Sequence, residues 1–263
     1  MNALSDIVLS EAAALVLAIV RLAGFVLVSP FPGKSVPNQV KVGLILLLAW
    51  VVRAGQPYLP SLHLDFMLLG LVPSELGVGL LIGFTVRLTY AAAELLGASF
   101  AQATGLTMAQ TYDPSMGTED PVPARVMTLL AMLLFLTMGA HRVALSYLIE
   151  SFRVVPIGHS PQISSSALIF VSFLSQSVEA GVRLSLPVVG VSLVVQAALA
   201  LVSRASPQLQ VFSLGMGISV AAAFLTVLGT LNDSAAGLGA EMEKEAPRIE
   251  QVLTEAAQGA APK

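Results

Sequence analysis

Eight charged side chains lie inside strongly apolar stretches of the sequence. A charged group is energetically unfavourable in such surroundings, so its presence indicates a specific role. They are Arg21, Glu75, Arg87, Glu94, Arg142, Glu179, Arg183 and Arg204. Ionisable groups inside membrane segments are rare, and they mark ion pathways, proton relays or charge pairs. In a secondary transporter, Glu75 or Glu179 would bind a coupling ion near helices broken at Pro73 and Pro187. In a structural assembly, the charges would pair across subunit contacts. Arginines are at least as numerous as acidic residues in these stretches, and they lie near predicted helix ends. Both observations favour charge pairing in an assembly over ion coupling in a transporter.

No catalytic constellation accompanies these charges. The histidines His63, His141 and His159 are scattered, and the sequence contains no HExxH zinc motif, no phosphate-binding GxxxxGK[ST] loop and no GxSxG elbow. Asp113 and Asp120 lie outside the apolar runs, so they are not the paired aspartates of an intramembrane protease. The chain has no cysteine, which excludes disulfides and thiolate metal sites. We therefore expect a protein that is not an enzyme and holds no cofactor or metal.

The composition points to a membrane environment. Hydrophobic residues make up 56% of the 263-residue chain, charged residues 11%, and the mean hydropathy is +0.83. Soluble domains carry about a quarter charged residues, so lipid or protein must cover much of this surface. The net charge of -3 gives no reason to expect a nucleic-acid partner. The predicted fold class is an all-α, polytopic integral membrane protein of long bent helices and helical hairpins.

Six apolar segments are predicted to be helical. They are Glu11–Ser29, Val40–Val52, Phe66–Thr111, Arg125–Phe152, Ala167–Val202 and Val211–Leu231. A single span needs about 20 residues. The third and fifth segments are much longer, and they contain Pro73 and Pro187. Each is therefore either a helical hairpin that does not fully cross the membrane or one helix that runs far past the bilayer.

The net charge is concentrated at the C-terminal end. From Asn232 onward there are six acids and three bases, whereas the preceding residues balance. We divide the chain into a membrane-embedded domain, residues 1–231, and an acidic tail, residues 232–263. Pro247 suits the first turn of a helix, and an apolar face follows at helical spacing: Ile249, Val252, Leu253 and Ala256. This helix would dock on a partner, or it would be a frayed end.

A proline-rich segment separates the third and fourth predicted helices. It consists of Tyr112, Asp113, Pro114, Ser115, Met116, Gly117, Thr118, Glu119, Asp120, Pro121, Val122 and Pro123. Three prolines, a glycine and three acids predict irregular backbone. Irregular backbone is not exposed to lipid, so the segment lies in water, is buried in protein or lines a cavity.

Several different short motifs follow one another along the chain. The joint between the last two apolar runs reads Ser-Arg-x-x-Pro-Gln-x-x-Val-Phe-x-x-Gly, carried by Ser203, Arg204, Pro207, Gln208, Val211, Phe212 and Gly215. Glu75 is followed at intervals of four by Gly79 and Gly83, a small-xxx-small pattern that permits close helix packing. The remaining motif positions are Arg21, Pro30, Pro37, Asp113-Pro114 and Pro187.

This ordered set, from about Arg21 to Leu231, resembles the FliR family of flagellar type III export-gate proteins, which is related to the SctT proteins of injectisomes. The resemblance implies a pore subunit in the bacterial inner membrane, at the flagellar basal body. Its partners would be FliP, FliQ and FlhB homologues, and unfolded flagellar proteins would pass through the pore. The segment of residues 112–123 would be the plug of the closed channel.

The chain departs from the family pattern near the last predicted helix. Gln210 stands where the family usually has Asn, and Gly217 and Ser219 stand where it often has Pro and Lys. These differences put the local bend and any charge contact there in doubt. The resemblance leaves two alternatives open, an injectisome homologue and an ion-coupled transporter.

Overall fold

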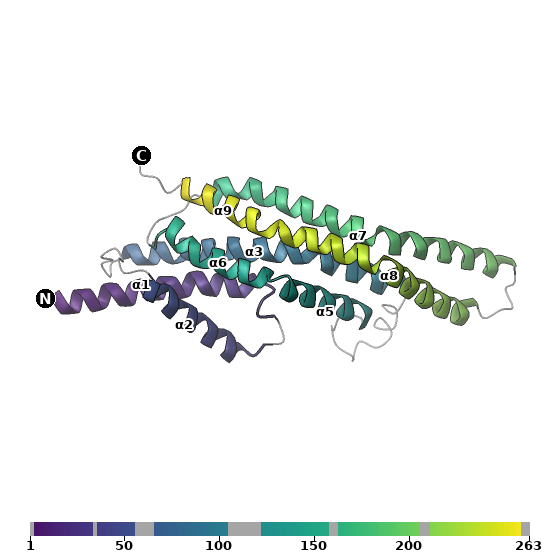
Figure 1. Cartoon of the computed structure of the whole chain (residues 1–263), viewed down its shortest axis with the longest axis horizontal. Coiled ribbons are helices and arrows are strands. Elements are labelled where there is room, and N and C mark those ends of the chain that lie inside the picture. Colours follow the sequence, from purple (N-terminus) through teal and green to yellow (C-terminus); the bar gives the residue numbers. More distant parts are fainter. Residues whose placement is uncertain are drawn as a thin grey trace. The chain divides into compact units, whose positions relative to one another are not determined.

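The computed structural model describes residues 3–33, 36–55, 66–104, 122–157, 163–205 and 211–258. Every regular element in these ranges is an α-helix: α1 (Ala3–Val28), α2 (Asn38–Gly55), α3 (Phe66–Ala103), α5 (Val122–Thr137), α6 (Ala140–Val154), α7 (Ile163–Ala205), α8 (Val211–Glu243) and α9 (Glu245–Gln258) (Figure 1). Five described segments are long and apolar enough to cross a membrane, or six if α5 and α6 together form one span. The predicted all-α polytopic class is confirmed.

The two over-long segments are each one continuous helix. Helix α3 has 38 residues and α7 has 43, which correspond to about 57 Å and 65 Å of helix. Both lengths exceed a hydrocarbon core of about 30 Å. Pro73 and Pro187 lie inside these helices, because a proline removes only one backbone hydrogen bond and the flanking turns keep theirs. The alternative of a hairpin within each segment is therefore wrong.

The predicted helix Arg125–Phe152 is also wrong as a single element. It is divided into α5 and α6 at Met138-Gly139. Gly139 has φ +75°, a left-handed conformation that glycine adopts without steric cost. Its carbonyl accepts hydrogen bonds from the amides of Arg142 and Val143, at 2.9 and 3.3 Å, and these bonds start α6.

The helices form two compact units that are discontinuous in sequence. Unit 1 contains residues 1–89, 139–174 and 244–263, and unit 2 contains residues 90–138 and 175–243. Helices α3 and α7 therefore contribute residues to both units. Helix α8 continues without interruption through Asn232, the residue at which the predicted tail begins.

In unit 1, α1 and α3 approach until their backbones touch. Gly79 and Gly83 of α3 lie against the main chain of α1 at Arg21 and Phe25, and a methyl group on either glycine would overlap those atoms. Small residues permit this approach in membrane helices. The small-xxx-small pattern at Gly79 and Gly83 thus packs against another helix of the same chain.

Two further contacts complete unit 1. Helix α2 packs on α1, with Leu48, Ala49 and Val52 buried. Helix α9 packs on α6, and its Val252 forms a buried cluster with Leu88 and Phe173. The apolar face predicted for the tail helix is therefore occupied by the chain itself: Ile249, Val252 and Leu253 are at most 3% exposed.

Unit 2 is built from the C-terminal part of α3 (residues 90–103), α5, most of α7, and α8. Helices α7 and α8 form an antiparallel hairpin, since Gly215 contacts Leu199 and Gly237 contacts Leu184. The Tyr90 hydroxyl donates a 2.7 Å hydrogen bond to the Thr128 carbonyl and thereby joins α3 to α5.

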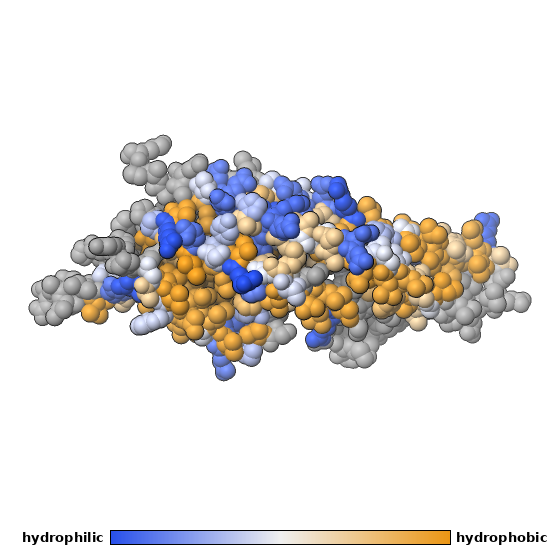
Figure 2. All heavy atoms as spheres, viewed as in Figure 1, coloured by the Kyte–Doolittle hydropathy of each residue, from blue (hydrophilic) through white to orange (hydrophobic). Residues whose placement is uncertain are grey.

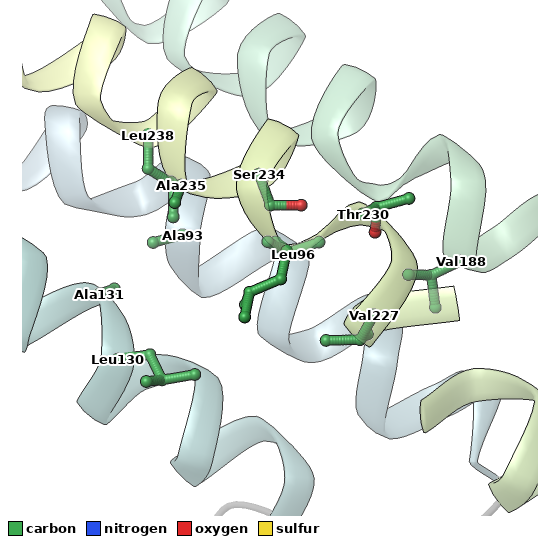
Figure 3. Close-up of a pocket in the computed structure, with 11 residues that line it drawn as sticks. Ala93, Leu96, Leu130, Ala131, Val188, Val227, Thr230, Ser234, Ala235 and Leu238 are labelled. Atoms are coloured by element: carbon green, nitrogen blue, oxygen red, sulfur yellow. The ribbon is translucent and has the colours of Figure 1, made fainter. Parts of the chain in front are cut away.

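Unit 2 also contains a small apolar cavity of about 40 Å³ (Figure 3). Ala93 and Leu96 of α3, Leu130 and Ala131 of α5, and Val188 of α7 line it, together with residues of α8. Thr230 and Ser234 of α8 supply its two hydroxyl groups (Figure 3). The hydroxyl of Thr230 is already engaged, because it donates to the Thr226 carbonyl at 2.8 Å.

We expect Gly79→Leu to destabilise unit 1, because its side chain would displace the α1 backbone at Arg21. Overpacking of this kind costs about 1–3 kcal/mol. The measurement is the thermal unfolding midpoint of the purified chain in detergent. Gly70→Leu in the same helix is the matched control, since a Cβ at Gly70 has open space around it. Equal midpoints for the two variants would contradict the prediction.

Candidate functional site

The site begins with Arg21, whose side chain is fully buried in the middle of α1 (0% exposed). A buried guanidinium is strongly unfavourable unless its charge and its five N–H donors are satisfied. Neighbouring side-chain and backbone groups supply the partners. Arg21 Nε donates to Glu75 Oε2 of α3 at 2.7 Å, and Glu75 is 1% exposed. Two of the isolated charges in the sequence are therefore one buried ion pair.

The other end of the guanidinium binds the C-terminus of α6. Nη1 donates to the Ser151 carbonyl at 2.9 Å and to Ser151 Oγ at 3.3 Å, and Nη2 donates to the Val155 carbonyl at 2.9 Å. The carbonyls at the C-terminal end of a helix carry partial negative charge. The Ser151 carbonyl also accepts the Val155 amide at 2.9 Å, so Arg21 is its second donor, and the Val155 carbonyl, just after α6, gains a donor too. One side chain therefore ties the end of α6 to α1 and α3.

An aromatic ring covers the same charge. The Cζ atom of Arg21 lies 4.4 Å from the centroid of the Phe152 ring, within range of a cation–π interaction. Sequence reasoning found Arg21 and Glu75 but not Ser151, Phe152 or Val155. Two of these contribute backbone carbonyls, which leave no signal in residue type, and the phenylalanine resembles any core residue.

This geometry favours a structural role over ion transport. Arginine donates hydrogen bonds but does not release its proton at accessible pH, so it does not relay protons. Its guanidinium engages Oε2 of Glu75 and neutralises the carboxylate charge that would attract a coupling ion. No group of three or more acidic, histidine or cysteine side chains suited to a metal occurs in the described parts of the chain.

A second, different ion pair lies in unit 2. Arg183 Nη2 contacts Glu179 Oε1 at 3.2 Å, as the i,i+4 spacing predicts, but the side chains are 77% and 69% exposed. The alternative use of Glu179, as a coupling-ion ligand, would place that ion at the surface. An exposed ion pair inside an apolar helix indicates that water or protein, rather than hydrocarbon, covers this part of α7.

A third pair joins α2 to α1 at the edge of unit 1. Arg53 binds Glu11, and both side chains are partly exposed. Of the remaining intramembrane charges, Arg87 and Glu94 have interactions within the protein, and Arg142 is exposed on α6. Arg87 and Glu94 both lie in α3.

The motif at the joint of α7 and α8 is only partly described. Ser203 and Arg204 are exposed at the C-terminal end of α7, whereas Pro207 and Gln208 lie outside the described residues. Val211 and Phe212 begin α8, and Gly215 packs on Leu199 of α7. The motif thus marks the turn of the α7–α8 hairpin.

The prolines near the N-terminus lie at the junction of α1 and α2. Pro30 follows α1, and the Pro37 carbonyl accepts hydrogen bonds from Val40 and Lys41 in the first turn of α2. The departures from the family pattern at Gly217 and Ser219 fall inside the continuous helix α8, so they introduce no break there.

The proline-rich segment requires one correction. Val122 and Pro123, predicted as irregular backbone, are the first residues of α5, because proline is well tolerated in the first turn of a helix. Residues 112–121 lie outside the described residues, so their placement as a plug stays a prediction.

Residues 12–244 match the family of bacterial export proteins, family 1. The match contains the whole Arg21 network, the α7–α8 hairpin and every motif position named above. The chain is a member of the FliR family of bacterial export proteins.

Individual FliR proteins agree with this assignment. The flagellar biosynthetic protein FliR of Escherichia coli K12 is 32% identical over 201 residues, which cover 74% of this chain and 77% of that protein. The FliR of Pectobacterium carotovorum is 31% identical and covers 79% of this chain and 80% of its own length. The FliR of Bacillus subtilis is 27% identical, with coverages of 82% and 85%. The FliR resemblance read from the motifs is confirmed.

We expect Glu75→Ala to destabilise the protein strongly, because it leaves the buried Arg21 charge without its carboxylate. Breaking a buried pair by removing one partner costs about 3–5 kcal/mol. The thermal unfolding midpoint of the purified chain in detergent measures this loss.

Glu179→Ala is the matched control, because exposed pairs contribute about 0.2–1 kcal/mol. The double variant Arg21→Met with Glu75→Ala removes the unpaired charge and should recover part of the loss. It should not recover all of it, since the Ser151 and Val155 carbonyls also lose the hydrogen bonds from Arg21. A Glu75→Ala chain as stable as the control would show that the pair does not hold unit 1 together.

Proposed function

We propose that this chain is a non-enzymatic subunit of a flagellar type III protein export gate in the bacterial inner membrane, at the basal body. There it would assemble with FliP, FliQ and FlhB homologues and line the pore through which unfolded flagellar proteins leave the cytoplasm. The family match over residues 12–244 carries the proposal. The relatives described above are flagellar proteins, which favours a flagellar over an injectisome role.

The surface of unit 2 supports an assembly. Only 11% of the residues are buried in the apolar windows of α7 and α8, and large apolar side chains stand exposed along both helices. They include Leu193, Val194, Leu201, Leu225 and Leu228. Contiguous exposed apolar surface is typical of a protein or membrane contact.

The exposed pair Glu179–Arg183 favours protein over lipid as the cover of α7. A charged side chain near the centre of a bilayer costs about 2.5–3.5 kcal/mol on insertion scales. A neighbouring subunit, or the wet lumen that it encloses, accommodates the pair at lower cost. Arg204, exposed at the end of α7, is available to a carboxylate of such a neighbour.

A photo-crosslinker at Leu193 tests the subunit contact. We expect a benzophenone amino acid at this exposed position (60% exposed) to form adducts with a FliP- or FliQ-type subunit in the intact assembly. Immunoblots of irradiated membranes detect such adducts. The same probe at Gln251, on the polar outer face of α9, is the control. Adducts with lipid alone at Leu193 would contradict the proposal.

A deletion tests the plug within the same proposal. We expect removal of residues 115–118 to leave the assembly intact but to let ions leak through the membrane, because a shortened segment no longer fills the channel. Growth and membrane potential of cells carrying the variant measure the leak. Replacing the same four residues by a Gly-Ser stretch of equal length is the control. A deletion variant that exports normally without leaking would rule out the plug.

A further inference from the structure

The outward face of α2 is a continuous apolar stripe. Its large members recur at helical spacing and are 47% to 71% exposed: Val42, Leu46, Leu47, Trp50 and Val51. The opposite face packs on α1 through Leu48, Ala49 and Val52. In Figure 2 the surface over α2, at the lower left, is largely hydrophobic. The stripe belongs to unit 1, which contains residues 1–89.

The charges of α2 stand at its two ends. Lys41 lies in the first turn and Arg53 in the last, and the eleven residues between them include no charged side chain. The helix has 18 residues, a length of about 27 Å, which is close to a hydrocarbon core of about 30 Å. Lys41 at one end of the uncharged stripe complements the anionic phosphates at one edge of a bilayer, whereas Arg53 at the other end pairs with Glu11.

Tryptophan marks one end of the stripe. Trp50 is the only tryptophan of the chain, is 71% exposed and lies three residues before Arg53. Tryptophan is enriched at the level of lipid head groups, with its ring partly in the apolar region. Arg53 reaches back to Glu11 of α1, so its charge is held on the inner side of the helix.

Helix α1 also exposes large apolar side chains, among them Val16 and Leu27, but its only basic residue, Arg21, is buried and does not reach a head group. The outer faces of α6 and α9 carry exposed charged and polar side chains, among them Arg142, Arg153, Glu250 and Gln251. In unit 2, α7 carries the exposed pair Glu179–Arg183. The outward face of α2 thus differs from the outer faces of α6, α9 and α7, which carry exposed charged side chains. Water or protein is the more favourable environment for those faces, but not for the uncharged stripe of α2.

We propose that the outward face of α2 contacts lipid acyl chains, so that α2 is a lipid-facing edge of the protein and not a subunit contact. Trp50 and Arg53 then lie at one head-group boundary and Lys41 at the other. This goes beyond the proposed export function, which concerns the surfaces of unit 2 and the central segment.

A spin label at Leu47 shows whether lipid, protein or water contacts the apolar stripe of α2. The chain has no native cysteine, so Leu47→Cys is labelled uniquely in otherwise native protein. The assembly is measured in vesicles of phosphatidylethanolamine and phosphatidylglycerol, with oxygen and a water-soluble nickel complex as collision partners. Lipid contact predicts oxygen collisions several-fold more frequent than nickel collisions. Gln251→Cys is the water-exposed control, where the ratio reverses, and Leu48→Cys is the protein-buried control, where both are low.

Infrequent collisions with both partners at Leu47 would mean that protein covers the stripe, and frequent nickel collisions would mean water. Either result overturns the proposal. Recovery of the assembly is measured separately, so failure here leaves the export proposal standing.

Trp50 provides a second measurement without any substitution. The full chain alone is reconstituted in vesicles with brominated phosphatidylcholine, and its tryptophan fluorescence is compared with that in unbrominated vesicles. We expect strong quenching by the bromines and weak quenching by aqueous acrylamide. The reverse order of quenching overturns the proposal even if the Leu47 label disturbs the assembly.

Discussion

The structure of unit 1 depends on the buried positive charge of Arg21. Arg21 has too many donors for one partner, so its burial requires Glu75 from α3 and two carbonyls from the end of α6 at the same time. Helices distant in sequence are thereby fixed in one register, because a shift of any of them leaves a buried polar group unsatisfied. Gly79 and Gly83 bring the α1 and α3 backbones into direct contact beside this pair.

Arginine–glutamate ion pairs have different roles in the two units. The Arg21–Glu75 pair is hidden and ties helices of one chain together. The Glu179–Arg183 pair is exposed and lies within one helix, so it contributes little to the fold and instead makes contact of this turn of α7 with lipid energetically costly. The hypothesis of pairing across subunits does not hold for Arg21 and Glu75, which pair within the chain.

Much of the fold follows from the sequence, because apolar length and helix breakers are local properties. The class, most helix positions and the apolar face of α9 could be predicted in this way. The division at Gly139 was missed, since a lone glycine in an apolar run is compatible with a continuous helix. The partners Ser151 and Val155 were missed because backbone carbonyls carry no residue signature. The covering of α9 by α6 is a tertiary contact that local patterns do not encode.

The place of α9 has a consequence for synthesis of the chain. Its Val252 completes a core with Leu88 and Phe173, residues translated much earlier. The core of unit 1 is therefore incomplete until Val252 of α9 has been translated. A chain truncated before α9 would leave Leu88 and Phe173 without this buried contact.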